Sequence, residues 1–236
     1  MRLGYKRLPD AFCGPLGGTA LQISEQDIDS YAYERLVEAI CALNWKGLSR
    51  EDLIDVATAY YYFSVQFREN LEIACVQYPD DEKLRQLELG ECNTDNLSPW
   101  PGVALPGEKL NHDEFMRRLL DLSPVDRHRR GCIDGIGRRY LDTIRRMDPD
   151  IRARSIASYE DGGLEKLFRA MLTAPDWDGA LLQAFRHFLI QHIRFDEDPE
   201  QGHGALSRHL APDDRILPLW QECKHLLVES VPALLS

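Results

Sequence analysis

The chain has 236 residues, of which 44% are hydrophobic and 28% are charged, which is enough apolar material for one domain with a sizeable core. Its formal net charge of −11 gives no electrostatic basis for binding nucleic acid or an anionic membrane surface. We therefore expect a small-molecule substrate or another protein as partner, and neither nucleic acid nor membrane. The oligomeric state stays open, with a homodimer among the options.

The first 24 residues predict an irregular N-terminal segment. They hold no apolar stretch long enough for a signal peptide, and no later window is long and apolar enough to span a bilayer. The six cysteines are scattered without a Cys-x-x-Cys pair, which argues against a zinc site built on thiolates. Scattered free cysteines are typical of a reducing compartment, so we expect a cytoplasmic protein.

Helical periodicity dominates the first half of the chain. Apolar side chains at helical spacing predict a helix over residues 25–44. The sequence Ser49-Arg-Glu-Asp52 has the pattern of a capping box and predicts the start of a long helix that reaches about Val76. Another helix is expected from Asp80-Asp81 to Gly90 or Glu91. Residues 93–110, rich in Pro, Gly and Asn, predict a long loop, and loops of this length are often functional.

The second half of the chain follows the same pattern. Asn111 is placed to cap the helix after the loop. Further helices are expected at about 124–147, 149–171, 176–197, 204–210 and 213–235. No convincing pair of segments alternates with the period of two that strands require. The sequence thus predicts an all-α fold, a single-domain bundle of about seven or eight helices that comprises residues 1–236.

Residues 192–203, at the end of a predicted core helix, contain three side chains able to bind a metal. His192 and Asp196 lie four positions apart, so about 40° apart on one helix face. Apolar neighbours suggest that this face is buried, where a histidine beside an aspartate needs a hydrogen-bond partner or a metal. Considered alone, a hydrogen-bonded pair in the core is the commoner case. His203 returns to nearly the same face, but Pro199 should kink or end the helix before it.

Other acids and a histidine precede this segment. Glu88 and Glu91 end a predicted helix, His112 begins the next one, and Glu160 is soon followed by two glycines that weaken a helix by about 1 kcal/mol each. Each has an ordinary alternative. The glutamates and His112 could face solvent, and the glycines after Glu160 could simply end a helix.

In chain order these residues resemble the haem-oxygenase-like di-iron oxidases. In that family a glutamate followed by x-Gly, a histidine at the start of a core helix, a later glutamate and a final His-x-x-x-Asp-x-x-His motif bind the metals. The elements that carry the resemblance are Glu88-Leu89-Gly90, His112-Asp-Glu-Phe115, Glu160 and His192-Ile-Arg-Phe-Asp196 with His203. The resemblance covers roughly residues 30–230, and the ordered set carries it rather than any single motif.

The chain departs from the family pattern at two points. The final histidine follows Asp196 after six residues instead of two, which leaves His209 as a weaker substitute for His203. The loop before His112 is longer than usual, which leaves Glu91 as an alternative to Glu88.

The resemblance implies a haem-oxygenase-like fold, two ferrous ions as cofactors and O2 as co-substrate. The substrate would be a small metabolite of specialised metabolism, such as an amino acid or fatty acid derivative, that undergoes desaturation, carbon–carbon cleavage or N-oxygenation. A metal-free enzyme of the same fold, similar to the quinone-cofactor-biosynthesis oxidases or the thiaminases, and a non-catalytic helical binding protein are the alternatives. The metal ligands that the resemblance implies are Glu88, His112, Glu160, His192, Asp196 and His203.

Overall fold

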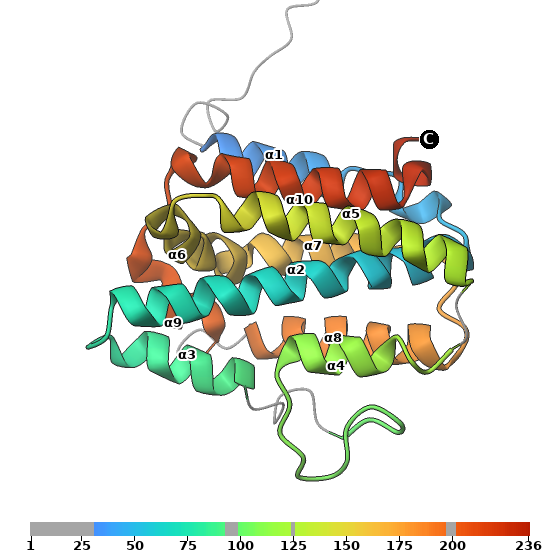
Figure 1. Cartoon of the computed structure of the whole chain (residues 1–236), viewed down its shortest axis with the longest axis horizontal. Helices are drawn as coiled ribbons and strands as arrows, with labels where there is room; N and C mark the ends of the chain where they lie inside the picture. Colours follow the sequence, from blue (N-terminus) through green and yellow to red (C-terminus); the bar gives the residue numbers. More distant parts are fainter. Residues whose placement is uncertain (1–30, 93–98, 124–125, 197–201) are drawn as a thin grey trace, which may run out of the picture. The chain divides into compact units, whose positions relative to one another are not determined.

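Helices form almost all of the regular structure in the computed structural model, which describes residues 31–92, 99–123, 126–196 and 202–236 (Figure 1). Within these ranges no strand is present, and Trp100 and Ala104 form an isolated β-bridge. The predicted all-α, single-domain fold is therefore confirmed for this part of the chain. The irregular segment predicted for residues 1–24 lies outside the described residues.

The first half of the fold is organised around one long helix. The side chain of Ser49 accepts a hydrogen bond from the backbone N–H of Asp52, and the Asp52 carboxylate accepts one from the N–H of Ser49. This capping box satisfies two backbone donors that a helix start leaves without intrahelical partners, and it begins the helix where the sequence predicts. The helices of this half are α1 (Ala32–Cys41), α2 (Arg50–Gln77), α3 (Glu82–Cys92) and α4 (His112–Leu119), with the 3₁₀ turn η2 (Trp45–Gly47) before α2.

The second half departs from the predicted helices at several points, since the segments predicted over 204–210 and 213–235 are divided into shorter helices and the one over 149–171 contains a π-helical break. The expected continuous helix over 149–171 is interrupted by a π-helical segment, η4 (Tyr159–Gly163), in which Gly162 has a φ of 90°. Glycine adopts this left-handed conformation without the steric cost that a Cβ would bring. The longer helices are α5 (Arg127–Arg145), α6 (Pro149–Ser158), α7 (Leu164–Met171), α8 (Ala180–Asp196) and α10 (Leu217–Ser230); the shorter ones are α9 (His203–Ser207), η5 (Arg208–Leu210), η6 (Asp214–Ile216) and η7 (Pro232–Leu235).

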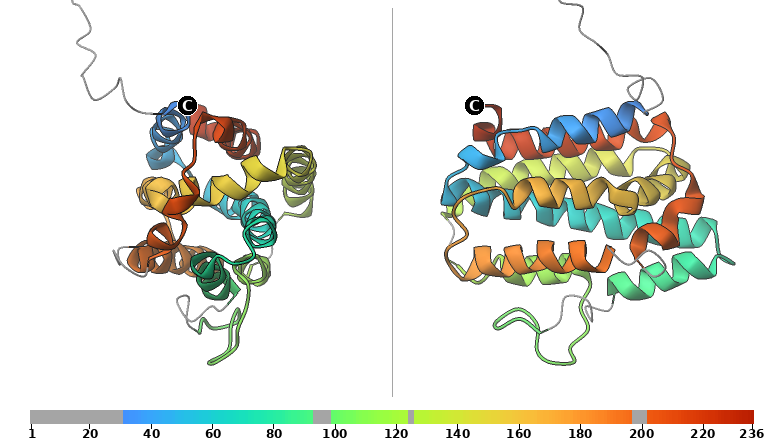
Figure 2. Two further views of the ribbon diagram at one scale, coloured as in Figure 1. Left: turned by 90° about the vertical axis from the view of Figure 1, so that its left-hand side faces the viewer. Right: turned by 180° about the vertical axis from the view of Figure 1, so that it is seen from behind.

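Helix α2 lies in the middle of the bundle. It packs against α5, α6 and α10 on one side and against α3, α4 and α8 on the other (Figures 1 and 2). Because it is covered on both sides, its hydrophobic residues do not form a single stripe, and Tyr60, Tyr62 and Phe63 are all buried. Within the described residues, no helix is long and apolar enough to cross a membrane.

Three contacts between helical segments bring the predicted site residues together. Helix α9 packs against α3 and against η4, and α4 packs against α8. In Figure 1, α3 and α9 lie next to each other at the same end of the bundle, and α4 lies beside α8. The beginnings of α4 and α9, the end of α3 and the π-helical segment therefore converge on one region.

Candidate metal centre

The first group of metal-capable side chains joins three helices. The Nδ1 atom of His112 lies 3.0 Å from Nε2 of His192 and 2.6 Å from Oε2 of Glu91. All three side chains are buried, and their ligand atoms lie within 4.8 Å of one another. This is a compact set of two imidazoles and one carboxylate.

Hydrogen bonds fix where the ring protons of these histidines lie. The Nδ1–H of His192 donates to the backbone carbonyl oxygen of Phe188 at 2.8 Å, which leaves a lone pair on Nε2 of His192. Because Oε2 of Glu91 and Nε2 of His192 are then both acceptors, the proton between them belongs to Nδ1 of His112. A metal cation placed among these three atoms would replace one proton, which is how imidazole and carboxylate sites bind metals.

A second group shares Glu91 with the first. The Nδ1 atom of His203 lies 2.8 Å from Oε2 of Glu160 and 3.3 Å from Oε1 of Glu91. These three side chains are also buried, and their ligand atoms likewise lie within 4.8 Å of one another. The two oxygens of Glu91 therefore face different groups, which is the arrangement of a carboxylate that bridges two cations.

Irregular backbone positions several of these ligands. His112 and His203 are the first residues of α4 and α9, and Glu160 lies in the π-helical segment. A Cβ atom added to Gly204 would lie 3.0 Å from the backbone oxygen of Glu160, so glycine is what lets α9 approach this segment. π-Helical segments of one turn occur frequently at functional sites.

Burial governs the electrostatics of the two acids. Burial raises the pKa of Glu160, although the neighbouring His203 opposes this. Burial also acts to raise the pKa of Glu91, but His112 and His203 outweigh it and leave that pKa lowered. Among the residues that the structure describes, neither acid is paired with lysine or arginine, and the basic side chains next to them are imidazoles. Buried carboxylates without stronger counter-charges favour a bound cation.

The surroundings of the histidines are aromatic and apolar. The ring of Phe188 lies 4.2 Å from that of His192 and the ring of Phe195 lies 4.4 Å from that of His203, measured between centroids. Burial, followed by the charge of His112, lowers the pKa of His192 to about 3. His192 is therefore neutral at neutral pH, which is the form that binds a metal.

The combined donor set fits two divalent transition-metal ions. Three imidazoles and two carboxylates suit iron, manganese or zinc better than calcium or magnesium, which prefer oxygen ligands alone. Inward-facing glutamates and histidines on facing helices are the usual way in which helical bundles build two-metal carboxylate sites.

The structure brings four of the six predicted ligands into these groups, and a fifth ligand was expected only as an alternative. His112, Glu160, His192 and His203 belong to the groups. The carboxylate that joins them is Glu91, whereas the predicted Glu88 is half-buried and belongs to neither.

Asp196 and His209 were the two remaining candidate ligands. Asp196 is the last residue of α8, and its side chain lies outside the described part of the structure. His209, the weaker substitute for His203, is exposed and pairs through Nε2 with Asp81 at the start of α3.

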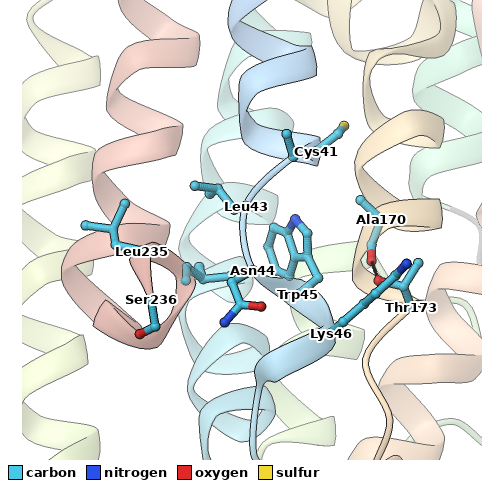
Figure 3. A pocket seen from close by; sticks show the side chains of 11 residues that line it. Cys41, Leu43, Asn44, Trp45, Lys46, Ala170, Thr173, Leu235 and Ser236 are labelled. Atoms are coloured by element: carbon cyan, nitrogen blue, oxygen red, sulfur yellow. Dashed lines mark hydrogen bonds between the residues drawn. The ribbon is translucent and has the colours of Figure 1, made fainter.

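A much wider pocket than the surroundings of these groups lies elsewhere. It has a volume of about 680 Å³ and is open to solvent between the end of α1, η2 and the C-terminal residues (Figure 3). Trp45 and Lys46 line it, together with Thr173, but in the described structure no histidine, aspartate or glutamate does. Because it shares no residue with either group, size alone does not identify the place where chemistry would occur.

Comparisons of the chain with protein-family models, with curated proteins and with solved structures find no match.

Proposed function

We propose that this protein is a non-haem di-iron oxidoreductase that uses O2 to oxidise a small metabolite, with a bundle of the haem-oxygenase-like type. The observation that carries the proposal is the position of Glu91, whose two carboxylate oxygens face two separate buried groups of ligands. The ordered resemblance of the sequence to the haem-oxygenase-like di-iron oxidases supports iron over other transition metals.

Each ligand has a defined part in this proposal. His112 and His192 would hold one ion and Glu160 and His203 the other, with Glu91 shared between them, as it is shared between the two groups of ligand atoms. Two ferrous ions held there would supply the electrons that reduce O2. The substrate class that accompanies this proposal is an amino acid or fatty acid derivative, changed by desaturation, carbon–carbon cleavage or N-oxygenation.

The residues around the ligands orient the side chain of His192 and exclude water from it. The carbonyl of Phe188 holds His192 in the tautomer that presents Nε2 to the centre. The aromatic rings of Phe188 and Phe168 contact His192 and keep its surroundings apolar. A dry, apolar site of this kind strengthens electrostatic interactions and protects reactive species from water.

Anaerobic titration with ferrous ion tests the proposal. Wild-type protein should bind two ions per chain, and His192→Ala and Glu160→Ala should each bind fewer. His225→Ala, which removes an exposed histidine of α10, is the matched control and should bind two. A transient absorbance on mixing the loaded protein with O2 would support O2 activation, and a substrate of the right class should change its lifetime.

The same titration separates the alternatives. Equal iron binding by wild type, His192→Ala and Glu160→Ala would refute the metal centre and would favour a metal-free enzyme or a non-catalytic binding protein. Two bound ions without any reaction with O2 would retain the metal centre and refute the oxidase.

A further inference from the structure

A narrow crevice between α2, α3 and α4 connects the surface with two of the proposed ligands. Glu91 and His112 belong to its lining, as do the apolar side chains of Phe67 and Leu71. Its water-accessible volume is about 40 Å³. One water needs roughly 10–15 Å³ of such volume, whereas pockets for metabolites measure about 300–1,000 Å³. The crevice is therefore of a size for water and small ions, and too small for an organic substrate.

The crevice carries an excess of negative charge. Glu72, Glu88 and Asp113 line it, together with a single cation, Arg68. Arg68 is already paired, through Nη1 with Oε1 of Glu72 at 2.5 Å and through Nε with Oδ2 of Asp113 at 2.9 Å. Within the part of the chain that the structure describes, Glu88 has no such partner and stands as an uncompensated carboxylate.

The position of Glu88 relates it directly to the metal centre. It lies three residues before Glu91 on α3, and residues three apart on a helix are neighbours on its surface. Glu88 is half-buried and Glu91 is buried, so the two carboxylates stand at successive depths along the same crevice.

A buried nitrogen provides an independent indication that a ligand uses this crevice. His112 lines it, is only 7% exposed, and has an Nε2 atom without any hydrogen-bond partner in the described structure. Its Nδ1 faces Glu91 and His192, so Nε2 is the ring nitrogen left for a further partner. A buried ring nitrogen without a hydrogen-bond partner is costly unless a ligand occupies the position in front of it.

We propose that this crevice is the route by which divalent metal ions reach the centre, and that Glu88 captures them and passes them to Glu91 and His112. Clefts lined by one sign of charge raise the local concentration and association rate of oppositely charged ligands. Glu88 acts here as a transient ligand, so it governs how fast metal arrives and not how much is bound at equilibrium. The proposal rests on the proposed function only in requiring that the centre binds metal.

Stopped-flow mixing with Co(II) tests this role, with the ligand-field absorbance of the bound ion as the signal. Glu88→Gln should slow association about tenfold, within the range of electrostatic effects on association rates, and leave the number of ions bound at equilibrium unchanged. Glu82→Gln removes the same charge from an exposed position in the first turn of α3 and is the matched control, expected to associate at the wild-type rate. Glu88→Asp should restore most of the rate.

Ionic strength supplies a second measurement on the same samples. Salt should slow association with the wild type more steeply than with Glu88→Gln, because it screens the charge that the variant lacks. A wild-type rate in Glu88→Gln would overturn the proposal. So would a lower number of bound ions in this variant, because Glu88 would then be a permanent ligand. If the wild type itself binds no Co(II) or Fe(II), the metal centre fails, which is distinguishable from a failure of the entry route alone.

Discussion

Replacing Glu91 with glutamine is the most informative single perturbation of the metal centre. Its two carboxylate oxygens lie 2.6 Å from Nδ1 of His112 and 3.3 Å from Nδ1 of His203, so one substitution affects both groups. The amide keeps the shape of the side chain and an oxygen that can accept from His112. Because the acceptor in the wild type is a carboxylate, the metal-free variant should be less stable by about 1.5–3 kcal/mol, the net value of a hydrogen bond to a charged group.

The effect on metal-dependent stability should be larger. An ion present at 100 times its Kd stabilises the folded state by about 2.7 kcal/mol, so two ions stabilise it by about 5 kcal/mol. For a domain of this size, about 1 kcal/mol changes Tm by roughly 2–4 °C, which predicts a rise of about 10–20 °C for the wild type on loading. Glu91→Gln should lose most of this rise, because the neutral amide neither bridges two cations nor balances their charge.

Thermal unfolding with and without Co(II), followed by circular dichroism, measures this difference. Glu88→Gln is the matched control one turn earlier on α3, and at equilibrium it should keep the full rise in Tm. A full metal-dependent rise in Glu91→Gln would refute the bridging role. A loss of the rise in Glu88→Gln with retention in Glu91→Gln would exchange the roles of the two glutamates.

Three further changes test the surroundings of the centre and the core. Burial raises the pKa of Asp55 to about 6 despite its ion pair with Arg129, so the folded state favours the protonated acid and loses stability as the pH rises from about 4 to above 6. Urea unfolding should show the wild type losing up to about 3 kcal/mol relative to Asp55→Asn over this interval, and a parallel profile for the two proteins would contradict the buried charge. Gly204→Ala should lower the affinity for Co(II) about tenfold or more, because the added Cβ would lie 3.0 Å from the backbone oxygen of Glu160 and push α9 away; an unchanged titration would show that this contact adjusts freely. Phe188→Ala should cost about 3–5 kcal/mol in the free energy of unfolding, since the ring is 1% exposed; a loss below 1 kcal/mol would mean that the site collapses around the missing ring.

The helices were predictable because their determinants are local. Apolar periodicity, the Ser49–Asp52 capping box and the proline-rich stretches all act within a few residues of the boundaries that they set. The break in the predicted helix at 149–171 was not predictable with the same certainty. Its cause is local at Gly162, but the benefit that compensates for the break comes from the approach of α9, which is distant in the sequence.

The helical phase of α3 distinguishes Glu88 from Glu91, but the resemblance to the family motif was given more weight. Leu84 and Leu87 are both fully buried, and Glu91 continues their stripe four positions beyond Leu87. Glu88 lies off that stripe and is half-buried. The helical phase of α3 therefore favours Glu91, whereas the resemblance to the family motif, with its glycine two positions later, favoured Glu88.

The distances between the ligands could not be predicted from the local sequence, because they depend on how distant helices pack. His112 and His192 are 80 residues apart, and their 3.0 Å separation depends on how α4 packs against α8. His203 was uncertain for the same reason, because its height along a continued α8 helix could not be deduced past Pro199. A new helix that begins at His203 replaces that continuation, and contacts with α3 and η4 set its position.

The distribution of the ligands over the fold bears on how the centre would respond to metal. Helix α2, buried between two sets of helices, contributes no member to either group. Three of the five ligands instead stand at the first residue of a helix or in the π-helical segment, where backbone hydrogen bonding is incomplete and small shifts break few bonds. The packed helices thus fix the location of the centre, while most of its ligands stand on segments with fewer backbone hydrogen bonds to hold them. If the proposed centre binds two cations, we therefore expect the ligand-bearing segments to adjust around them while α2 and the core packed on it keep their positions.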